Sequence, residues 1–373
     1  MTEKISHCYV CDLPITVENV SKEHIIINAA GGRLASKNLL CKKCNNSFGE
    51  TIDAELARQL NFLSNFLLIK RYDGDPPAII GTDKETGEKY KMTTEGHLDM
   101  KNPTVTFKDH GDHKEVSIAA RNKKELVTIL NNIKKKYPLF DVENALRQAN
   151  EAERYLDKPL QFSMIIGGVT VERAVCKCAI NYFIEMGGDS KWIKHLIPFI
   201  KGEVAKKCVC LFYPSPIYEL QDDECFHLLH LVGSLEEGIL YCYVDYFNSH
   251  KYLVLLSEEY SGPAIEKTYC YNILNQSVIQ KRVNLKLTKA LVSEALASAV
   301  LMDEIKKNLI RSWNIGNKRQ HALHMEKLVK NAMEEWHKNH PDVENLSQEN
   351  MEDFLENVSF KLAKYLSRGI SKT

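Results

Sequence analysis

Two cysteine pairs frame the stretch that decides the fold: Cys-Tyr-Val-Cys at residues 8–11 and Cys-Lys-Lys-Cys at residues 41–44. Each pair has the Cys-x2-Cys spacing, which brings two thiolates within reach of one tetrahedral ion. Four such thiolates predict a structural zinc site at Cys8, Cys11, Cys41 and Cys44. Zinc binding supplies folding free energy of order 10 kcal/mol, which can hold together a unit too small to be stable alone.

The residues between the cysteine pairs predict a strand, a loop and the start of a helix. The run Ser-Lys-Glu-His-Ile-Ile-Ile at 21–27 belongs to a predicted strand over 20–27, and a glycine pair marks a turn in the loop at 28–37. Leucine and isoleucine at helical spacing predict a mostly helical segment over 46–69, with an apolar face that must pack on another element.

The order of polar residues in this stretch resembles that of the HNH endonucleases. It runs Cys-x2-Cys, then Glu23-His24, then Asn38, then Cys-x2-Cys followed directly by Asn45. The longer pattern, Glu-His-Ile-Ile-x4-Gly-Gly and then Leu-Cys-x2-Cys-Asn-x3-Gly-x2-Ile-Asp, is similar to a subgroup of stand-alone bacterial members with cysteine knuckles. The resemblance implies a ββα fold that grips one divalent ion.

Hydrolysis of a phosphodiester needs a base for the attacking water and a cation that neutralises charge on the scissile phosphate. A histidine with a pKa near 6.5 suits the first role, so His24 is the candidate base. The resemblance assigns Asn38 to orienting the imidazole, and Glu23 and Asn45 to the catalytic ion. Mg²⁺ or Mn²⁺ would suit these ligands, because hard cations prefer carboxylate and amide oxygens.

Two positions depart from the common pattern of this family. Asn45 stands where many members have histidine, and Glu23 stands where many have aspartate, which is one methylene shorter. Gly49 and Asp53 match the subgroup; we expect backbone geometry to explain the glycine and helix hydrogen bonding to explain the aspartate.

The amino-acid composition limits the class of protein and its charge distribution. The chain has 373 residues, 44% of them hydrophobic, which predicts a globular protein with a sizeable core. It has neither a run of about 18 apolar residues nor an apolar segment at the start, so we expect no membrane contact and a cytoplasmic location. Net charge is zero, but residues 101–136 carry nine basic and four acidic residues, and residues 281–319 nine and three. Either segment could face phosphates or be a solvated helix face.

The remaining cysteines favour buried thiols over disulfides, because no secretion signal is present. A second zinc site, built from the Cys-x-Cys pairs at 176–178 and 208–210, is the alternative. Helices are predicted after Asn122 and Asp141, and over 170–186 and 190–200. An antiparallel sheet is predicted from strand-like runs at 208–213, 226–232, 239–247, 252–256 and 268–274. In the last part of the chain, helices are predicted at 288–313, 320–337 and 347–366.

The predicted fold class is therefore α+β. A zinc-stapled ββα-metal HNH unit at residues 1–72 is followed by a mixed region of helices and antiparallel sheet at 73–280 and a helical C-terminal region at 281–373. The expected function is a metal-dependent HNH endonuclease acting on DNA, in settings that include bacterial defence against foreign DNA. The alternative is a non-catalytic module that binds nucleic acid or protein and uses its knuckles only for structure. The later regions would bind substrate, contact a regulatory protein partner or form a homodimer.

Overall fold

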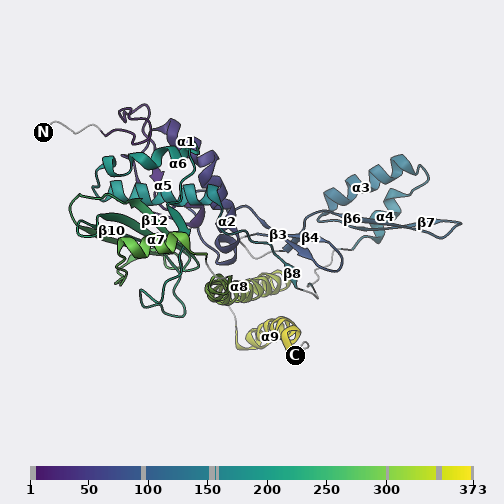
Figure 1. Cartoon of the computed structure of the whole chain (residues 1–373). Coiled ribbons are helices and arrows are strands. Elements are labelled where there is room, and N and C mark those ends of the chain that lie inside the picture. The colour runs from purple at the N-terminus through teal and green to yellow at the C-terminus, as the bar shows by residue number, and fades with distance from the viewer. Residues whose placement is uncertain are drawn as a thin grey trace. The chain divides into compact units, whose positions relative to one another are not determined.

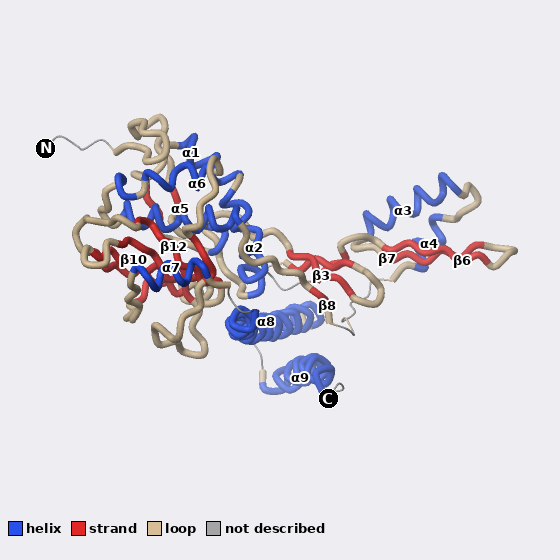
Figure 2. The backbone as a smooth tube through the Cα atoms, viewed as in Figure 1, coloured by secondary structure: helices blue, strands red, loops and turns tan. Residues whose placement is uncertain are grey.

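The computed structural model describes residues 6–93, 98–150, 156, 159–299, 302–341 and 347–370. Helices and antiparallel strands make up these residues, so the predicted α+β class is confirmed (Figures 1 and 2). The chain divides into two compact units, one of Met1–Asp75 with Ile166–Thr373 and one of Pro76–Ile165. The second unit is thus inserted into the first. This division differs from the expected ranges, because elements after residue 166 share a core with the N-terminal residues.

The zinc-binding stretch forms the predicted ββα arrangement. Strand β1 (Glu23–His24) pairs antiparallel with β2 (Ala35–Ser36), and helices α1 (Lys42–Glu50) and α2 (Ile52–Phe66) follow. The strand is shorter than expected, because the chain turns through the 3-10 turn η1 (Asn28–Ala30) instead of continuing the ladder. The helix starts earlier than expected and is broken at Thr51, whose φ is −116° and ψ −90°.

The Gly31-Gly32 turn brings the loop after β1 close to neighbouring backbone. Gly31 has a φ of +82°, a conformation that side chains disfavour. A Cβ at Gly32 would lie 2.0 Å from the carbonyl oxygen of Ile26, so only glycine fits there. The turn thereby holds β2 against β1 and fixes the position of His24 at the end of the strand.

The apolar face of α2 is buried, as its spacing predicts. Ile52, Leu56, Leu60 and Leu63 are each at most 2% exposed. This helix packs against α5 (Val169–Glu185) and against α8 (Met302–Asn339). N-terminal and later residues therefore form one hydrophobic core.

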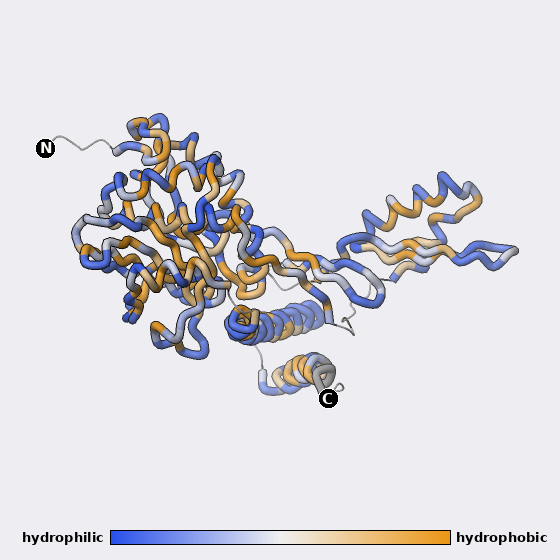
Figure 3. The backbone as a smooth tube through the Cα atoms, viewed as in Figure 1, coloured by the Kyte–Doolittle hydropathy of each residue, from blue (hydrophilic) through white to orange (hydrophobic). Residues whose placement is uncertain are grey.

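A six-stranded antiparallel sheet forms the centre of the first unit, in the order β14-β13-β10-β11-β12-β9. Its strands are β9 (Val209–Leu211), β10 (Phe226–Ser234), β11 (Ile239–Tyr246), β12 (His250–Ser257), β13 (Ile265–Asn272) and β14 (Ser277–Ile279). Helices α5 and α7 (Lys289–Ala297) cover opposite faces of the sheet (Figure 1). Every residue of β11 is buried as a result, and apolar residues concentrate in this layer (Figure 3).

The described residues of the inserted unit form two small antiparallel sheets and two helices. The first sheet has the order β5-β4-β3-β8 and the second is the hairpin β6-β7. Asn122 and Asp141 cap the helices with their side chains, as predicted. The elements are β3 (Ile79–Asp83), β4 (Lys89–Met92), β5 (Leu98–Met100), β6 (Thr104–Asp109), β7 (Lys114–Ala119), α3 (Lys123–Lys136), α4 (Val142–Gln148) and β8 (Leu160–Gln161).

The C-terminal helices differ from the prediction in their breaks. Helix α7 ends at Ala297, whereas α8 runs without a break through Gly316, where the sequence had predicted a gap between two helices. A Cβ at Gly316 would lie 2.3 Å from a ring carbon of Phe66, so this glycine permits close packing of α8 on α2 rather than ending a helix. Helix α9 (Gln348–Ile370) packs against α8. In the sequence, η2 (Ser190–Trp192), η3 (Lys194–Leu196) and α6 (Ile197–Lys201) follow α5 and precede β9.

No helix in the described part of the chain is both long and apolar enough to cross a bilayer.

Candidate active site and metal centre

The four predicted zinc ligands come together in the structure. The Sγ atoms of Cys8, Cys11, Cys41 and Cys44 all lie within 4.8 Å of one another, and those of Cys11 and Cys41 are 3.7 Å apart. A tetrahedral zinc ion with Zn–S bonds of about 2.3 Å requires S–S distances of about 3.8 Å. The cluster therefore fits a structural zinc ion.

Zinc at this cluster ties the first loop of the chain to a helix. Cys41 is the N-cap of α1 and Cys44 lies in its first turn, whereas Cys8 and Cys11 belong to the N-terminal loop. Within the described residues, no other group of three or more His, Cys, Asp or Glu side chains is spaced to hold a metal. The alternative of a second cysteine site at 176–178 and 208–210 is therefore not formed there.

His24 lies beside a cavity of about 220 Å³. A Cβ at Gly49, on the cavity wall, would meet nothing within 4 Å, so the glycine leaves this side open. The lining residues are Glu23, His24, Ile27, Asn28, Ala29, Gly49, Asp53, Ala54 and Ala57. The cavity thus brings together the candidate base and two carboxylates.

Two basic side chains and an aromatic ring lie near the half-buried His24. The rings of His24 and Tyr72 are 6.4 Å apart, and Lys22 and Arg33 lie 4.4 and 5.9 Å from the centre of the Tyr72 ring. Burial lowers the pKa of His24 from 6.5, and the charges of Lys22 and Arg33 lower it further against the opposing effect of Asp73. The imidazole is therefore neutral at pH 7, which is the state a general base requires.

Asn38 and Asn45 lie outside this cavity. Asn38 is exposed after β2; its backbone N–H donates to Ser36 Oγ at 3.2 Å, and its side chain makes no hydrogen bond within the described residues. Asn45 on α1 donates its side-chain N–H to Ser21 Oγ at 2.7 Å and to the carbonyl of Lys22 at 3.4 Å. Asn45 therefore holds α1 against the segment that leads into β1.

Glu23 is buried and is held by α5. Its Oε1 lies 2.7 Å from Lys177 Nζ and accepts a hydrogen bond of 2.8 Å from Asn181 Nδ2. Lys177 Nζ also donates to Asp53 Oδ2 at 2.5 Å. The aspartate expected to hydrogen bond within its helix thus forms an ion pair with α5 instead.

The same network reaches the zinc centre. Asn181 Oδ1 accepts a hydrogen bond of 2.8 Å from the hydroxyl of Tyr9, which stands between Cys8 and Cys11. Sequence reasoning missed both Lys177 and Asn181. A local signal marked these two positions, although not their partners: they lie four residues apart, and both are polar side chains among the mostly apolar buried residues of α5.

The network contains one cation for two carboxylates. Burial raises the pKa of Glu23 and of Asp53, although the nearby Lys177 ammonium opposes this. Burial alone would lower the pKa of Lys177, but the carboxylates of Asp53 and Glu23 outweigh it and raise that pKa above 10.5. The ammonium persists, and the site can take additional positive charge.

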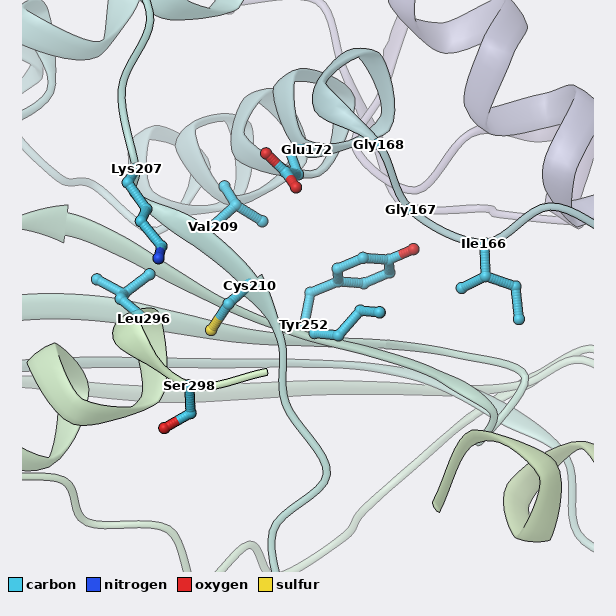
Figure 4. A pocket seen from close by; sticks show the side chains of 11 residues that line it. Ile166, Gly167, Gly168, Glu172, Lys207, Val209, Cys210, Tyr252, Leu296 and Ser298 are labelled. Atoms are coloured by element: carbon cyan, nitrogen blue, oxygen red, sulfur yellow. The ribbon is translucent and has the colours of Figure 1, made fainter. Parts of the chain in front are cut away.

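A second cavity of about 250 Å³ lies where α5 begins (Figure 4). Glu172 and Lys207 line it without forming an ion pair, and the buried Tyr252 hydroxyl has no hydrogen-bond partner among the described residues. No histidine lines this cavity. The candidate site for phosphodiester chemistry is therefore the cavity beside His24.

Comparison with protein families matches residues 8–61 to the family described as HNH endonuclease. The match starts at the first zinc ligand and ends within α2, so it includes every polar residue that the sequence motif contains. No curated protein matches the chain, and no solved structure does. Lys177 and Asn181 lie well outside the matched segment.

Proposed function

We propose, from the premise that residues 8–61 belong to the HNH endonuclease family, that this protein is a metal-dependent endonuclease that hydrolyses phosphodiester bonds of DNA. One observation supports this most strongly. His24 lies on the wall of a cavity directly after a buried carboxylate, on a ββα scaffold with a four-cysteine centre. A purely structural knuckle would not require this combination.

Each motif residue has a role in the proposed reaction. His24 accepts the proton of the attacking water, and its lowered pKa keeps it ready to do so at neutral pH. The family resemblance assigns Asn38 to orienting the imidazole and Asn45, with Glu23, to holding the divalent ion; of these three residues, Glu23 lines the cavity and the two asparagines do not. A bound Mg²⁺ or Mn²⁺ neutralises charge on the scissile phosphate. Glu23 offers an oxygen to such an ion, because its Oε2 accepts no hydrogen bond within the described residues.

The basic and aromatic side chains near His24 support a nucleic-acid substrate. Lys22 and Arg33 place two cations beside His24, and phosphate contacts of this kind hold DNA without reading its sequence. Tyr72, whose ring lies near both cations, offers an aromatic surface to an unpaired base. DNA as substrate, a role in defence against foreign DNA, and pairing of two copies to cut both strands all belong to this proposal.

Incubation of supercoiled plasmid with the zinc-loaded protein and Mg²⁺ or Mn²⁺ tests the proposal. The wild type should give open circles or linear DNA, and His24→Ala should lose at least 100-fold of the rate, the usual contribution of a general base. His195→Ala is the matched control, since His195 is another histidine with a lowered pKa, exposed and outside the cavity. It should cut normally.

Two outcomes would contradict the nuclease proposal. One is equal cleavage by the wild type and a His24→Ala variant that retains zinc. The other is DNA binding by the wild type with no cleavage under any divalent ion, which would favour the non-catalytic module instead. The ratio of open circles to linear product separates nicking from paired cuts.

A further inference from the structure

Lys177 is a lysine at the centre of α5 whose side chain is only 2% exposed. Removing an ammonium from water is unfavourable unless opposite charges and hydrogen bonds replace the water. Two carboxylates do so here, Glu23 from β1 and Asp53 from α2. Both side chains also line the cavity beside His24. A lysine from outside the matched family segment thus lies directly against the proposed active site.

The contacts leave one oxygen of each carboxylate free. Glu23 uses Oε1 for Lys177 and Asn181, and Asp53 uses Oδ2 for Lys177. Glu23 Oε2 and Asp53 Oδ1 accept no hydrogen bond within the described residues, and neither is sealed from solvent. The bound oxygens both touch one nitrogen, at 2.7 and 2.5 Å, so the two carboxylates lie side by side.

We propose that Asp53 and Glu23 together bind the divalent ion beside His24, and that Lys177 and Asn181 are positioning residues that hold these carboxylates in place. The catalytic role of this ion rests on the proposed function, whereas the binding of the ion does not. In this arrangement Asp53 is a metal ligand that the family motif did not assign, and α5 is part of the active site.

Charge balance explains why a lysine accompanies the ion. Two carboxylates this close repel each other, and the Lys177 ammonium holds them together before any ion is bound. One negative charge remains, which attracts a divalent cation without filling its place. Mg²⁺ keeps several of its waters and needs only one or two carboxylates, so two free oxygens are sufficient.

Mn²⁺ binding to the zinc-loaded full-length protein, followed by electron paramagnetic resonance of the free ion, tests whether Asp53 is a ligand of the ion. Asp53→Asn keeps the shape of the side chain and leaves Lys177 paired with Glu23, and it should weaken Mn²⁺ binding at least tenfold. Glu224→Gln is the matched control, because Glu224 forms a similar 2.7 Å pair with Lys281 away from the cavity. It should bind Mn²⁺ as the wild type does. Unchanged binding in Asp53→Asn would overturn the proposal.

Lys177→Met tests the positioning role. Without the ammonium, the ion is the only counter-charge for Glu23 and Asp53, so Mn²⁺ should bind at least threefold more tightly and raise Tm by more than in the wild type. DNA cleavage should nevertheless fall, because the carboxylates are no longer fixed. A purely structural lysine would leave Mn²⁺ binding unchanged, and that result would overturn this role. If Lys177→Met does not fold, Asp53→Asn alone decides the proposal.

These measurements separate the two proposals. Mn²⁺ binding that depends on Asp53, in a protein that cuts no DNA, would uphold the cation site and remove the nuclease. DNA cleavage that depends on His24, with Mn²⁺ binding that is indifferent to Asp53, would uphold the nuclease and remove this site.

Discussion

Replacing Asp245 by asparagine should stabilise the fold at neutral pH. Asp245 lies on the central strand β11 and is fully buried. The Tyr218 hydroxyl donates to its Oδ2 at 2.5 Å, whereas Oδ1 has no hydrogen-bond partner in the described part of the chain. Burial raises the pKa of Asp245 to about 6, although the Lys251 ammonium and the Tyr218 hydrogen bond oppose this. The folded state therefore favours the neutral acid.

The sign follows from the two pKa values. The folded-state value of about 6 lies above the ordinary value of 3.8, so the contribution of Asp245 to stability is complete below pH 4 and is lost as the pH rises through 6. A shift of this size corresponds to about 3 kcal/mol of lost stability above pH 7. By the same linkage, about half of that loss, roughly 1.4 kcal/mol, develops between about pH 5 and pH 7.5.

Urea unfolding of the zinc-loaded wild type and of Asp245→Asn, at about pH 5 and pH 7.5, measures how this loss of stability differs between the two proteins. Asparagine has the same shape and no charge, and its amide oxygen can accept from Tyr218. The stability advantage of the variant should therefore grow by about 1.4 kcal/mol from pH 5 to pH 7.5. Titration of every other group is common to both proteins and cancels. An advantage that does not change with pH, or a variant that is less stable at pH 7.5, would refute the reasoning.

Three further changes test other parts of the fold. Removing zinc with a strong chelator should lower Tm and reduce helix content in circular dichroism, because metal binding is coupled to folding. Unaltered melting would argue against a structural ion. Gly316→Ala should lower the free energy of unfolding by about 1–3 kcal/mol, because the added methyl group overpacks against Phe66. Gly49→Ala has open space around it and should raise the free energy of unfolding by about 0.5–1 kcal/mol. Urea midpoints of the two variants that move in the same direction would contradict this. Trp336→Ala removes the buried ring whose N–H donates to Asp353 at 2.9 Å. The backbone amides of α9 should then exchange hydrogen faster, as measured by mass spectrometry. Unchanged protection of these amides would count against packing of α9 through this ring.

Features that depend on residues close in sequence were predicted well. The Cys-x2-Cys spacing predicted the four-cysteine cluster, and the ββα order is the one that the resemblance to HNH endonucleases implies. The caps at Asn122 and Asp141 were also local, because a cap bonds to its own helix. The roles of Asn38 and Asn45 remain predictions, since neither residue lines the cavity beside His24.

Features that depend on distant partners were not predicted. Lys177 meets Asp53 across 124 residues and Asn181 meets Glu23 across 158, and no local pattern reports such contacts. The local preferences of glycine and asparagine predict a gap between helices at residues 314–319, which include Gly316. Packing against Phe66 outweighs these preferences and keeps α8 continuous. Long-range packing of the same kind joins α5 to the core begun by the N-terminal residues, through its contact with α2.

The position of Lys177 in the chain has a consequence for protein synthesis. After it has added Asp53, the ribosome must add 124 more residues, the last of which is Lys177. At about 5–20 residues per second, this takes roughly 6–25 s. A nascent chain during that interval carries the cysteine knuckles and His24 but lacks the helix that holds the two carboxylates. Synthesis of the zinc-binding segment and completion of the proposed cutting site are therefore separate events in time.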